Sequence, residues 1–345
     1  RKSLSDLRDL DSAVEDDSHG KFEAPKVGGD YHLYAVDAAG NVSSHSKNAL
    51  TVDTEAPKVD VGKLETDIRA LVRTWEDDLA EAARENGYDS RIRALASGFP
   101  ADYRAITPAA RALHDATLLA GISADNPFVV DFYRDTGHDE SHAALKIFHR
   151  GEPVSLSGRV PALENMGLKV IAERTFQTGA PDGVPVFIHD MEVESAAGHL
   201  VDLSDEGQLL QDTFAAASRG AVDDDPYNGL SHSAGLTHDE ITVLRTYGRY
   251  QQQAGSTFGQ PVIASALNRY PLIARDLYDL FDARFHPARA DGRSQECDRL
   301  RKSIMAKLDN VPGIDEDTIL RRYLPLIDAT MRTNRYAAPV EGVPP

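Results

Sequence analysis

Two histidines in this chain have a spacing that could support metal binding. His138 and His142 lie four positions apart in the run Gly-His-Asp-Glu-Ser-His. On a helix, that spacing places two imidazoles on one face, as a zinc pair requires. Here the run falls at the tip of a predicted hairpin, and Glu140 is not where HExxH needs its acid. The pattern therefore favours a solvent-exposed turn over a metal site.

Two candidate nucleophiles are also poorly placed. Cys297 stands between Glu296 and Asp298 on what we take to be the polar face of a helix. Neighbouring carboxylates raise a thiol pKa and make the thiolate scarce. Ser231 precedes a histidine but lacks the GxSxG elbow and the strand before it. It is better explained as part of a loop before a helix that starts at Thr237. We predict no catalytic residue in this chain.

Clusters of charge give no specific site either. Asp223, Asp224 and Asp225 are adjacent, so their carboxylates should point in different directions, whereas a calcium site needs six or more oxygens. Tyr247 and Tyr250, with two arginines nearby, could stack on bases. At helical spacing in an acidic chain, packing and ion pairs are the better explanation. Asp and Glu are abundant, and no particular pair of carboxylates stands out as catalytic.

A nucleotide cofactor needs glycine-rich turns that this sequence does not have. No two of its 25 glycines are two positions apart, so the first half of a GxGxxG fingerprint is absent throughout. A GxxxxGK[ST] phosphate loop is absent as well. The sequence thus predicts that no cofactor and no metal bind to this chain itself.

Composition restricts the class of protein. The 345 residues carry a formal net charge of −18, which opposes binding to nucleic acid and to anionic membranes. A single cysteine allows no internal disulfide and is typical of a cytoplasmic protein. No apolar run reaches the roughly 18 residues of a membrane span. Hydrophobic residues at 41% are enough for a packed core.

The first hundred residues predict a small β module followed by helices. Residues 1–30 are polar, and apolar and polar residues then alternate between Tyr31 and Val52 around a turn at 37–41, as in a hairpin. Apolar residues recur at three and four positions from Val61 to Asn86, which predicts one long helix stopped by Gly87. A short helix over 90–96 should follow, and a third should open at Thr107-Pro108.

The middle of the chain predicts an α+β sandwich. Strands are expected at 128–134 and 143–148, a helix at 155–166, and strands from 168 and from 185 to 193. Gly167 should end the helix just before the third strand. Short links favour an antiparallel or mixed sheet with helices on one face. From Ser204 to Thr333 the pattern is helical, with a capping box at Thr237-His-Asp-Glu240.

Twelve blocks of text resemble the large-subunit class of bacterial NAD-specific glutamate dehydrogenases, in the segment before the catalytic domain. They run in the family's order through about four-fifths of the chain. They are 59–61, 75–79, 99–104, 145–151, 163–174, 186–190, 228–230, 234–236, 243–247, 315–317, 319–322 and 329–334. No single block is a catalytic motif, and the resemblance is specific only as a set.

The resemblance implies an ACT-like, ferredoxin-like module followed by an all-helical region. With the N-terminal hairpin this gives five predicted segments: 1–57 of uncertain character, a helical connector at 58–106, the ACT-like domain at 107–220, a helical domain at 221–334 and a tail at 335–345. It implies a cytoplasmic homo-oligomer that contacts other domains of the same polypeptide. An amino-acid effector could bind at the turn formed by Asn165, Gly167 and Leu168.

The resemblance also implies that the catalytic domain follows the position of Asn334. The parent enzyme would then oxidise L-glutamate to 2-oxoglutarate with NAD, while this chain would be inactive. Its start at Arg1 suggests a piece of a longer protein. Residues 34–43 and 50–57 resemble bacterial immunoglobulin-like repeats more than the dehydrogenase. A binding or adhesion protein is therefore the alternative.

Overall fold

The computed structural model describes residues 28–32, 34, 39, 42–44, 46, 47, 49–52, 63, 73–134, 142–180, 182–198, 201, 203 and 207–337. Contacts divide the chain into two units, Arg1–Arg73 and Thr74–Pro345. In the first unit, β1 (Gly29–Tyr31) pairs antiparallel with β2 (Leu50–Val52), with Tyr31 opposite Leu50. This pairing agrees with the predicted hairpin, whose turn lies mostly outside the described residues. The finer predicted division into five segments stays a prediction.

The second unit begins with four helices, which we call the connector helices although the fourth falls within the predicted ACT-like segment 107–220. They are α3 (Trp75–Glu85), α4 (Ser90–Ser97), α5 (Ala101–Ile106) and α6 (Ala109–Ala120). The predicted helix from Val61 through Asn86 is wrong at Thr74, because Thr74 has extended backbone and forms a capping box with Asp77. Most of the residues before Arg73 lie outside the described part. Gly87 has φ +69°, which confirms the predicted stop, whereas α5 was not predicted.

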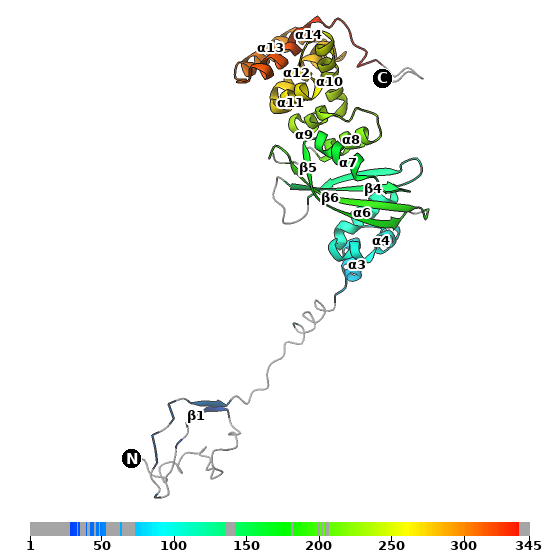
Figure 1. Cartoon of the computed structure of the whole chain (residues 1–345). Coiled ribbons are helices and arrows are strands. Elements are labelled where there is room, and N and C mark those ends of the chain that lie inside the picture. The colour runs from blue at the N-terminus through cyan, green and yellow to red at the C-terminus, as the bar shows by residue number, and fades with distance from the viewer. Residues whose placement is uncertain are drawn as a thin grey trace. The chain divides into compact units, whose positions relative to one another are not determined.

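A four-stranded antiparallel sheet forms the centre of this unit, in the order β3-β4-β6-β5 (Figure 1). Its strands are β3 (Phe128–Tyr133), β4 (His142–Arg150), β5 (Leu168–Gly179) and β6 (Pro185–Ser195). The helix α7 (Leu156–Asn165) links β4 to β5, and α8 (Gly207–Ser218) follows β6. The predicted α+β class is confirmed.

The order of elements is a rearranged ferredoxin-like fold. From β4 onward the chain runs β4, α7, β5, β6, α8, which is a βαββαβ unit without its last strand. β3 fills that strand's place at the sheet edge beside β4, but it comes first in the chain. The ACT-like module therefore keeps the ferredoxin-like sheet order with one edge strand moved to its start.

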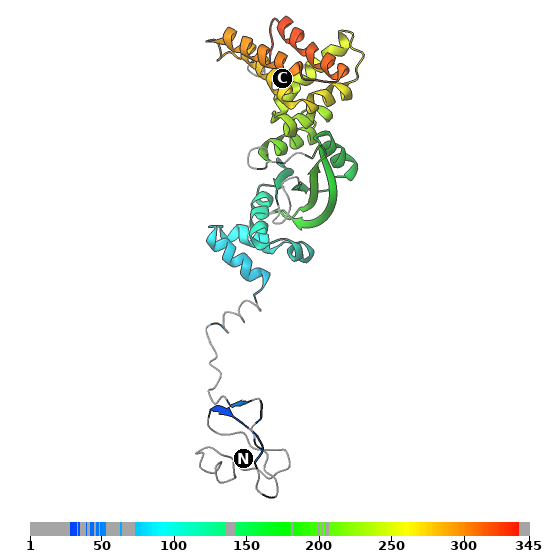
Figure 2. The same ribbon diagram turned by 90° about the vertical axis from the view of Figure 1, so that its left-hand side faces the viewer.

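Helices cover both faces of this sheet, so the predicted single covered face is wrong (Figure 2). Phe148, Phe176 and Ile188 pack against the connector helices. Leu145 and Ile147 point the other way, into a core shared with α7 and α8. Because β4 is enclosed on both sides, its residues 143–148 are buried without alternation.

The remaining chain is helical, as predicted. It contains a 3₁₀ turn, η1 (Pro226–Gly229), and the helices α9 (Leu230–Ala234), α10 (His238–Gln253), α11 (Gln260–Arg269), α12 (Pro271–Phe285), α13 (Arg293–Leu308) and α14 (Ile314–Ala329). Thr237 and Glu240 form the predicted capping box of α10. Ser204, the predicted cap of α8, lies outside the described residues.

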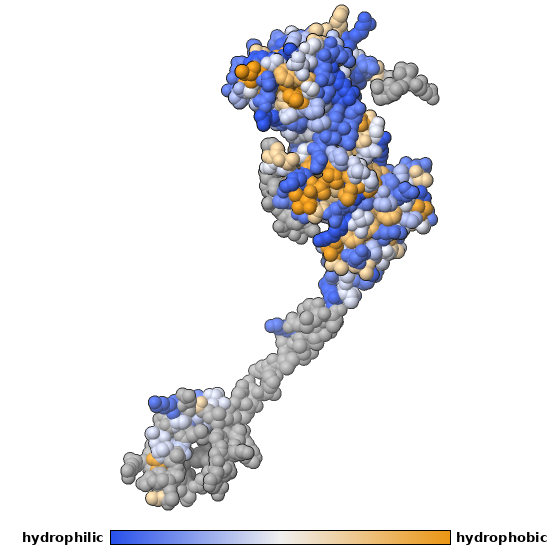
Figure 3. Space-filling model, in the orientation of Figure 1, coloured by the Kyte–Doolittle hydropathy of each residue, from blue (hydrophilic) through white to orange (hydrophobic). Residues whose placement is uncertain are grey.

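On the face of the second unit that Figure 3 shows, polar surface surrounds an apolar area where α7 and β5 lie. Leu156 on α7 and Ile171 on β5 remain about half exposed, and Ile171 is the extra residue of a β-bulge between Val170 and Ala172. No helix among the described residues is long and apolar enough to cross a membrane.

Candidate functional site

The predicted effector turn forms a tight helix-to-strand link. Asn165 is the last residue of α7, Gly167 has φ +78°, and Leu168 is fully buried at the start of β5. Only glycine adopts this φ without strain, so the predicted role of Gly167 as the helix stop is confirmed. The Gly167 carbonyl accepts a hydrogen bond of 2.8 Å from Ala196 N, which fixes the turn to the end of β6.

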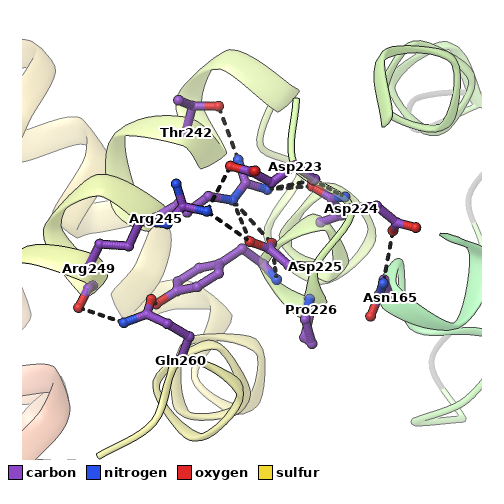
Figure 4. Close-up of polar contacts among 12 residues, drawn as sticks. Asn165, Asp223, Asp224, Asp225, Pro226, Thr242, Arg245, Arg249 and Gln260 are labelled. Atoms are coloured by element: carbon purple, nitrogen blue, oxygen red, sulfur yellow. Dashed lines mark hydrogen bonds and ion pairs between the residues drawn. The ribbon is translucent and has the colours of Figure 1, made fainter. Parts of the chain in front are cut away.

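The turn contacts the acidic loop that opens the helical region (Figure 4). Asn165 Nδ2 donates to Asp224 Oδ1 at 2.8 Å. The turn and the Asp223–Asp225 run lie in separate parts of the sequence. The structure brings them together at the junction of the ACT-like module and the helical region.

The prediction that the three carboxylates of the acidic loop point in different directions holds only for Asp224, because Asp223 and Asp225 both lie within 4.0 Å of Arg249 Nη2. Asp223 Oδ2 lies 2.8 Å from Arg249 Nη2, and Asp225 Oδ2 lies 2.9 Å from Arg245 Nε. Asp224 faces Asn165 instead. Within the described residues, no group of three or more histidine, cysteine, aspartate or glutamate side chains is arranged to hold a metal ion. The loop is therefore an ion-paired connection in this structure.

Arg245 is the central residue of the junction. Its side chain is 2% exposed, and Nη2 donates to Asn228 Oδ1 at 2.6 Å while Nη1 donates to Thr242 Oγ1 at 3.2 Å. Asn228 Nδ2 donates in turn to the Asp223 carbonyl at 3.0 Å. A buried guanidinium needs a counter-charge and hydrogen-bond acceptors, and Asp225 and Asn228 supply them. The predicted ion pairing of the arginines on this helix is confirmed.

The helix α10 approaches η1 closely at Gly248. A Cβ at this position would lie 2.0 Å from Tyr227 Oη. That hydroxyl donates to Gln260 Oε1 at 2.8 Å, and burial raises the Tyr227 pKa. Gly248 thus leaves the space in which Tyr227 connects η1 to α11.

A second contact joins the module to the helical region. His232 Nε2 on α9 lies 3.0 Å from Ser195 Oγ at the end of β6, and both residues are almost fully buried. Ser231, the predicted loop serine, lies on the short helix α9 and donates to the Asn228 carbonyl at 2.8 Å. Neither serine is exposed to a substrate.

Inside the module, His189 connects β6 to the loop before α7. Val154 N donates to His189 Nε2 at 3.2 Å, so the proton of the neutral ring is on Nδ1, 3.2 Å from Glu173 Oε1. Arg159 also pairs with Glu173. Burial, together with the Arg159 charge, lowers the pKa of His189.

A cavity of about 480 Å³ lies at the other end of α7. It is lined by Asp125, Asn126, Pro127, Phe128, His149, Val154, Ser218 and Arg219. Asn165, Gly167 and Leu168 do not line it, because α7 separates Val154 from Asn165 by about 15 Å at 1.5 Å per residue. The effector role of the turn therefore stays a prediction.

The two remaining predicted features are the histidine pair, of which only His142 is described, and the placement of Cys297. His142 begins β4 with Nε2 3.5 Å from Glu194 Oε2, whereas His138 lies outside the described residues. The placement of Cys297 on a polar face is wrong, because it is 4% exposed in the core of the helical region. It continues the apolar stripe of Leu300 and Ile304, a spacing that the sequence already contained.

Comparison with known proteins agrees with this architecture. The family model "Glutamate dehydrogenase, ACT3 domain" matches residues 127–206, and "Glutamate dehydrogenase, helical motif 3" matches residues 222–287. The chain therefore resembles a segment of the NAD-specific glutamate dehydrogenases. The acidic loop and Arg245 lie within the match to helical motif 3, and Asn165 lies within the match to the ACT3 domain.

Three curated relatives are named NAD-specific glutamate dehydrogenase. The chain is 34% identical over 321 residues to that of Halomonas elongata, which covers 91% of this chain and 20% of the relative. It is 36% identical over 285 residues to that of Pseudomonas aeruginosa, covering 81% and 18%. It is 32% identical over 295 residues to that of Mycobacterium tuberculosis, covering 81% and 18%. The chain therefore spans about a fifth of the length of these glutamate dehydrogenases.

Proposed function

We propose that this chain is a regulatory and architectural segment of an NAD-dependent glutamate dehydrogenase. In the parent enzyme, L-glutamate would be oxidised to 2-oxoglutarate with NAD, and this segment would not take part in the chemical step. The observation that carries the proposal is the junction, where Asn165 and Arg245 connect the ACT-like module to the helical region through one acidic loop. We expect such a connection to transmit a displacement of one module to the other.

The proposal also covers the partners, the location and the effector of the segment. It would contact other domains of its polypeptide in a cytoplasmic homo-oligomer, with an amino acid as effector. The sequence identity to three relatives named NAD-specific glutamate dehydrogenase supports the proposed parent enzyme. The match to the ACT3 domain supports a regulatory rather than a catalytic role for this segment.

A double-mutant cycle in the full-length enzyme that contains the segment tests the proposal. Asn165→Ala, Asp224→Ala and the double variant are compared for kcat/KM with glutamate and NAD, and for subunit assembly. We expect each single variant to change these values and the double variant to add little, since one contact is lost in all three. Lys169→Ala, which removes an exposed ion pair with Glu194, is the control. Wild-type kinetics and assembly in all three variants would contradict the proposal.

The alternative of a binding or adhesion protein has less support. The match to the Halomonas elongata relative covers 91% of the 345 residues and leaves about 31 residues outside it. The segment 1–57, which contains the immunoglobulin-like stretches 34–43 and 50–57, is longer than that. The dehydrogenase likeness therefore extends into the N-terminal segment. NADH formation from glutamate by the purified chain alone would contradict its assignment as non-catalytic.

A further inference from the structure

A cluster of buried and partly buried polar groups lies between the connector helices and the sheet. Its members come from five elements: Tyr103 on α5; Arg111, His114 and Asp115 on α6; Asp131 and Tyr133 on β3; Lys146 on β4; and Asp190 on β6. None of these residues belongs to the junction described above. The cluster is the polar part of an interface that is otherwise apolar.

Lys146 and Asp115 form the inner part of the cluster. Their side chains are 1% and 0% exposed, and Lys146 Nζ lies 2.5 Å from Asp115 Oδ2. Tyr103 Oη donates to the same carboxylate oxygen. Since Asp115 belongs to α6 and Lys146 to β4, this ion pair connects the connector helices directly to the sheet.

Arg111 and Asp131 form the outer part. Arg111 pairs with Asp131, lies over the Tyr133 ring at 3.7 Å, and has Nε 3.0 Å from Asp115 Oδ1. His114 Nε2 lies 3.5 Å from Asp131 Oδ2 and is 45% exposed, so it stands at the rim. Burial alone would raise the pKa of Asp131, but hydrogen bonds from His114 and Arg111 lower it.

Asp190 is the third carboxylate and has the weakest compensation. Tyr133 Oη donates to Asp190 Oδ1 at 2.7 Å, but Lys146 Nζ is 3.9 Å from Oδ2 and lies closer to Asp115. Arg174 is the register partner of Asp190 on β5, and its side chain is exposed. Burial raises the pKa of Asp190, despite the Lys146 charge and the Tyr133 hydrogen bond.

The charges of the cluster do not balance without a proton. Asp115, Asp131 and Asp190 face two permanent cations, Arg111 and Lys146. On the same face, Glu192 lies two residues beyond Asp190 on β6 and adds no positive charge. An uncompensated buried charge is costly, so the cluster favours binding one further proton over remaining net negative.

We propose that docking of the connector helices onto the sheet is coupled to one proton, held by Asp190 against Tyr133 and Lys146. The docked state binds this proton and the undocked state releases it. The connector is therefore held more tightly as pH falls and less tightly as pH rises. The segment contains a proton-sensitive contact between its connector and its ACT-like module.

Trp75 provides the readout, because it is the single tryptophan of the chain and lies on α3. Its Nε1 donates to the Thr107 carbonyl at 2.9 Å, so its fluorescence reports on the connector. Urea unfolding of the full chain is followed by this signal from about pH 5 to pH 9. We expect Asp190→Asn, which mimics the protonated acid, to become more stable than the wild type as pH rises. This difference between the two proteins excludes the opposite contribution that His189 makes at acidic pH. The two proteins should be equally stable at the acidic end.

Control variants separate this proposal from a general effect of charge. Asp182→Asn removes an exposed carboxyl paired with Arg150 on the sheet and should keep the wild-type slope. Carboxyl-carbon NMR of the wild-type chain reports directly on Asp190 and needs no variant to fold. We expect it to stay protonated above the ordinary aspartate range. An ordinary Asp190 titration, or a slope lost in His114→Gln and kept in Asp190→Asn, would overturn the assignment.

Discussion

Asn165 Nδ2 donates a hydrogen bond of 2.8 Å to Asp224 Oδ1, although the two residues are 59 positions apart in the chain. One belongs to the C-terminal end of α7 and the other to the loop before η1. A helix C-terminus carries a partial negative charge, so the neutral amide of Asn165 suits this position beside a carboxylate better than an acid would. The relative position of module and helical region thus depends in part on a side chain in the predicted effector turn.

Asn165→Asp should weaken this junction more than Asn165→Ala. The new carboxylate faces Asp224 and the helix dipole, which we expect to cost about 1 kcal/mol, against about 0.5 kcal/mol for alanine. Calorimetry of the chain at low and high salt measures the effect. Because the repulsion is between exposed groups, salt should reduce the difference between the variants. Equal unfolding temperatures for both variants at low salt would contradict this view.

Arg245→Met should destabilise the chain strongly. Loss of the guanidinium leaves the Asp225 carboxylate with Arg249 at 4.0 Å as its remaining cation and leaves Asn228 Oδ1 without its donor. We expect a loss of about 2 to 4 kcal/mol in the free energy of unfolding. Urea denaturation measures it. Arg299→Ala removes an exposed pair with Glu296 and should have little effect. Similar midpoints for the two variants would show that the Arg245 network contributes little.

Gly248→Ala should be destabilising, because its Cβ would overlap the Tyr227 hydroxyl. Relief requires η1 to move from α10, and we expect a cost of about 1 to 3 kcal/mol. Gly158 is the matched control, since it also lies in a helix but a Cβ there meets only Ser155 Oγ at 3.5 Å. Gly158→Ala should stabilise by about 0.5 to 1 kcal/mol. Thermal melts of both variants decide between steric overlap and simple helix propensity.

Gly167→Ala should cost about 1 to 2 kcal/mol through backbone strain alone. No atom lies within 4 Å of a Cβ built at Gly167, so packing does not contribute. Gly167→Asn should cost less, because asparagine adopts positive φ more readily than alanine. Urea midpoints of the two variants provide the test. An alanine variant as stable as asparagine would indicate that the turn relaxes to another conformation.

The stability of the module should depend on pH through His189, whose ring is neutral in the folded state. Its pKa is lowered in the fold, so the unfolded chain binds this proton more readily, and the stability contributed by His189 is lost as pH falls below about 6.5. His189→Gln can still accept from Val154 N and should remove this part of the slope. Nitrogen NMR of the imidazole checks the assignment directly. A ring protonated at pH 6 would contradict it.

Local pattern predicted the elements of the ACT-like module well. The α7 stripe, the glycine at 167 and the strand that follows are all encoded within a few residues of each other. The predicted break at Gly87 and the capping box at Thr237 have the same origin. The same kind of signal was overlooked at Thr74 and at Cys297, where a capping box and an apolar stripe were present in the sequence.

Local sequence patterns do not predict contacts between residues that are far apart in the chain. Nothing near Asp224 indicates that its partner is Asn165, and nothing near Asp115 indicates Lys146. One clue existed for the second pair, since Lys146 is the only charged residue in an apolar run that lacks the alternation of a half-exposed strand. That run also indicated a sheet covered on both faces. Both contacts depend on how the chain folds, because the partners are far apart in the sequence.

The early position of β3 in the chain places the two ends of the ACT-like module next to each other. Arg219, which follows α8, donates from Nη2 to the carbonyl of Phe128, the first residue of β3, at 3.1 Å. A unit whose ends meet can be inserted into a host polypeptide, or removed from it, with little change in the distance between the flanking residues. Gene duplication could thus multiply such units within one reading frame while the neighbouring helices keep their positions.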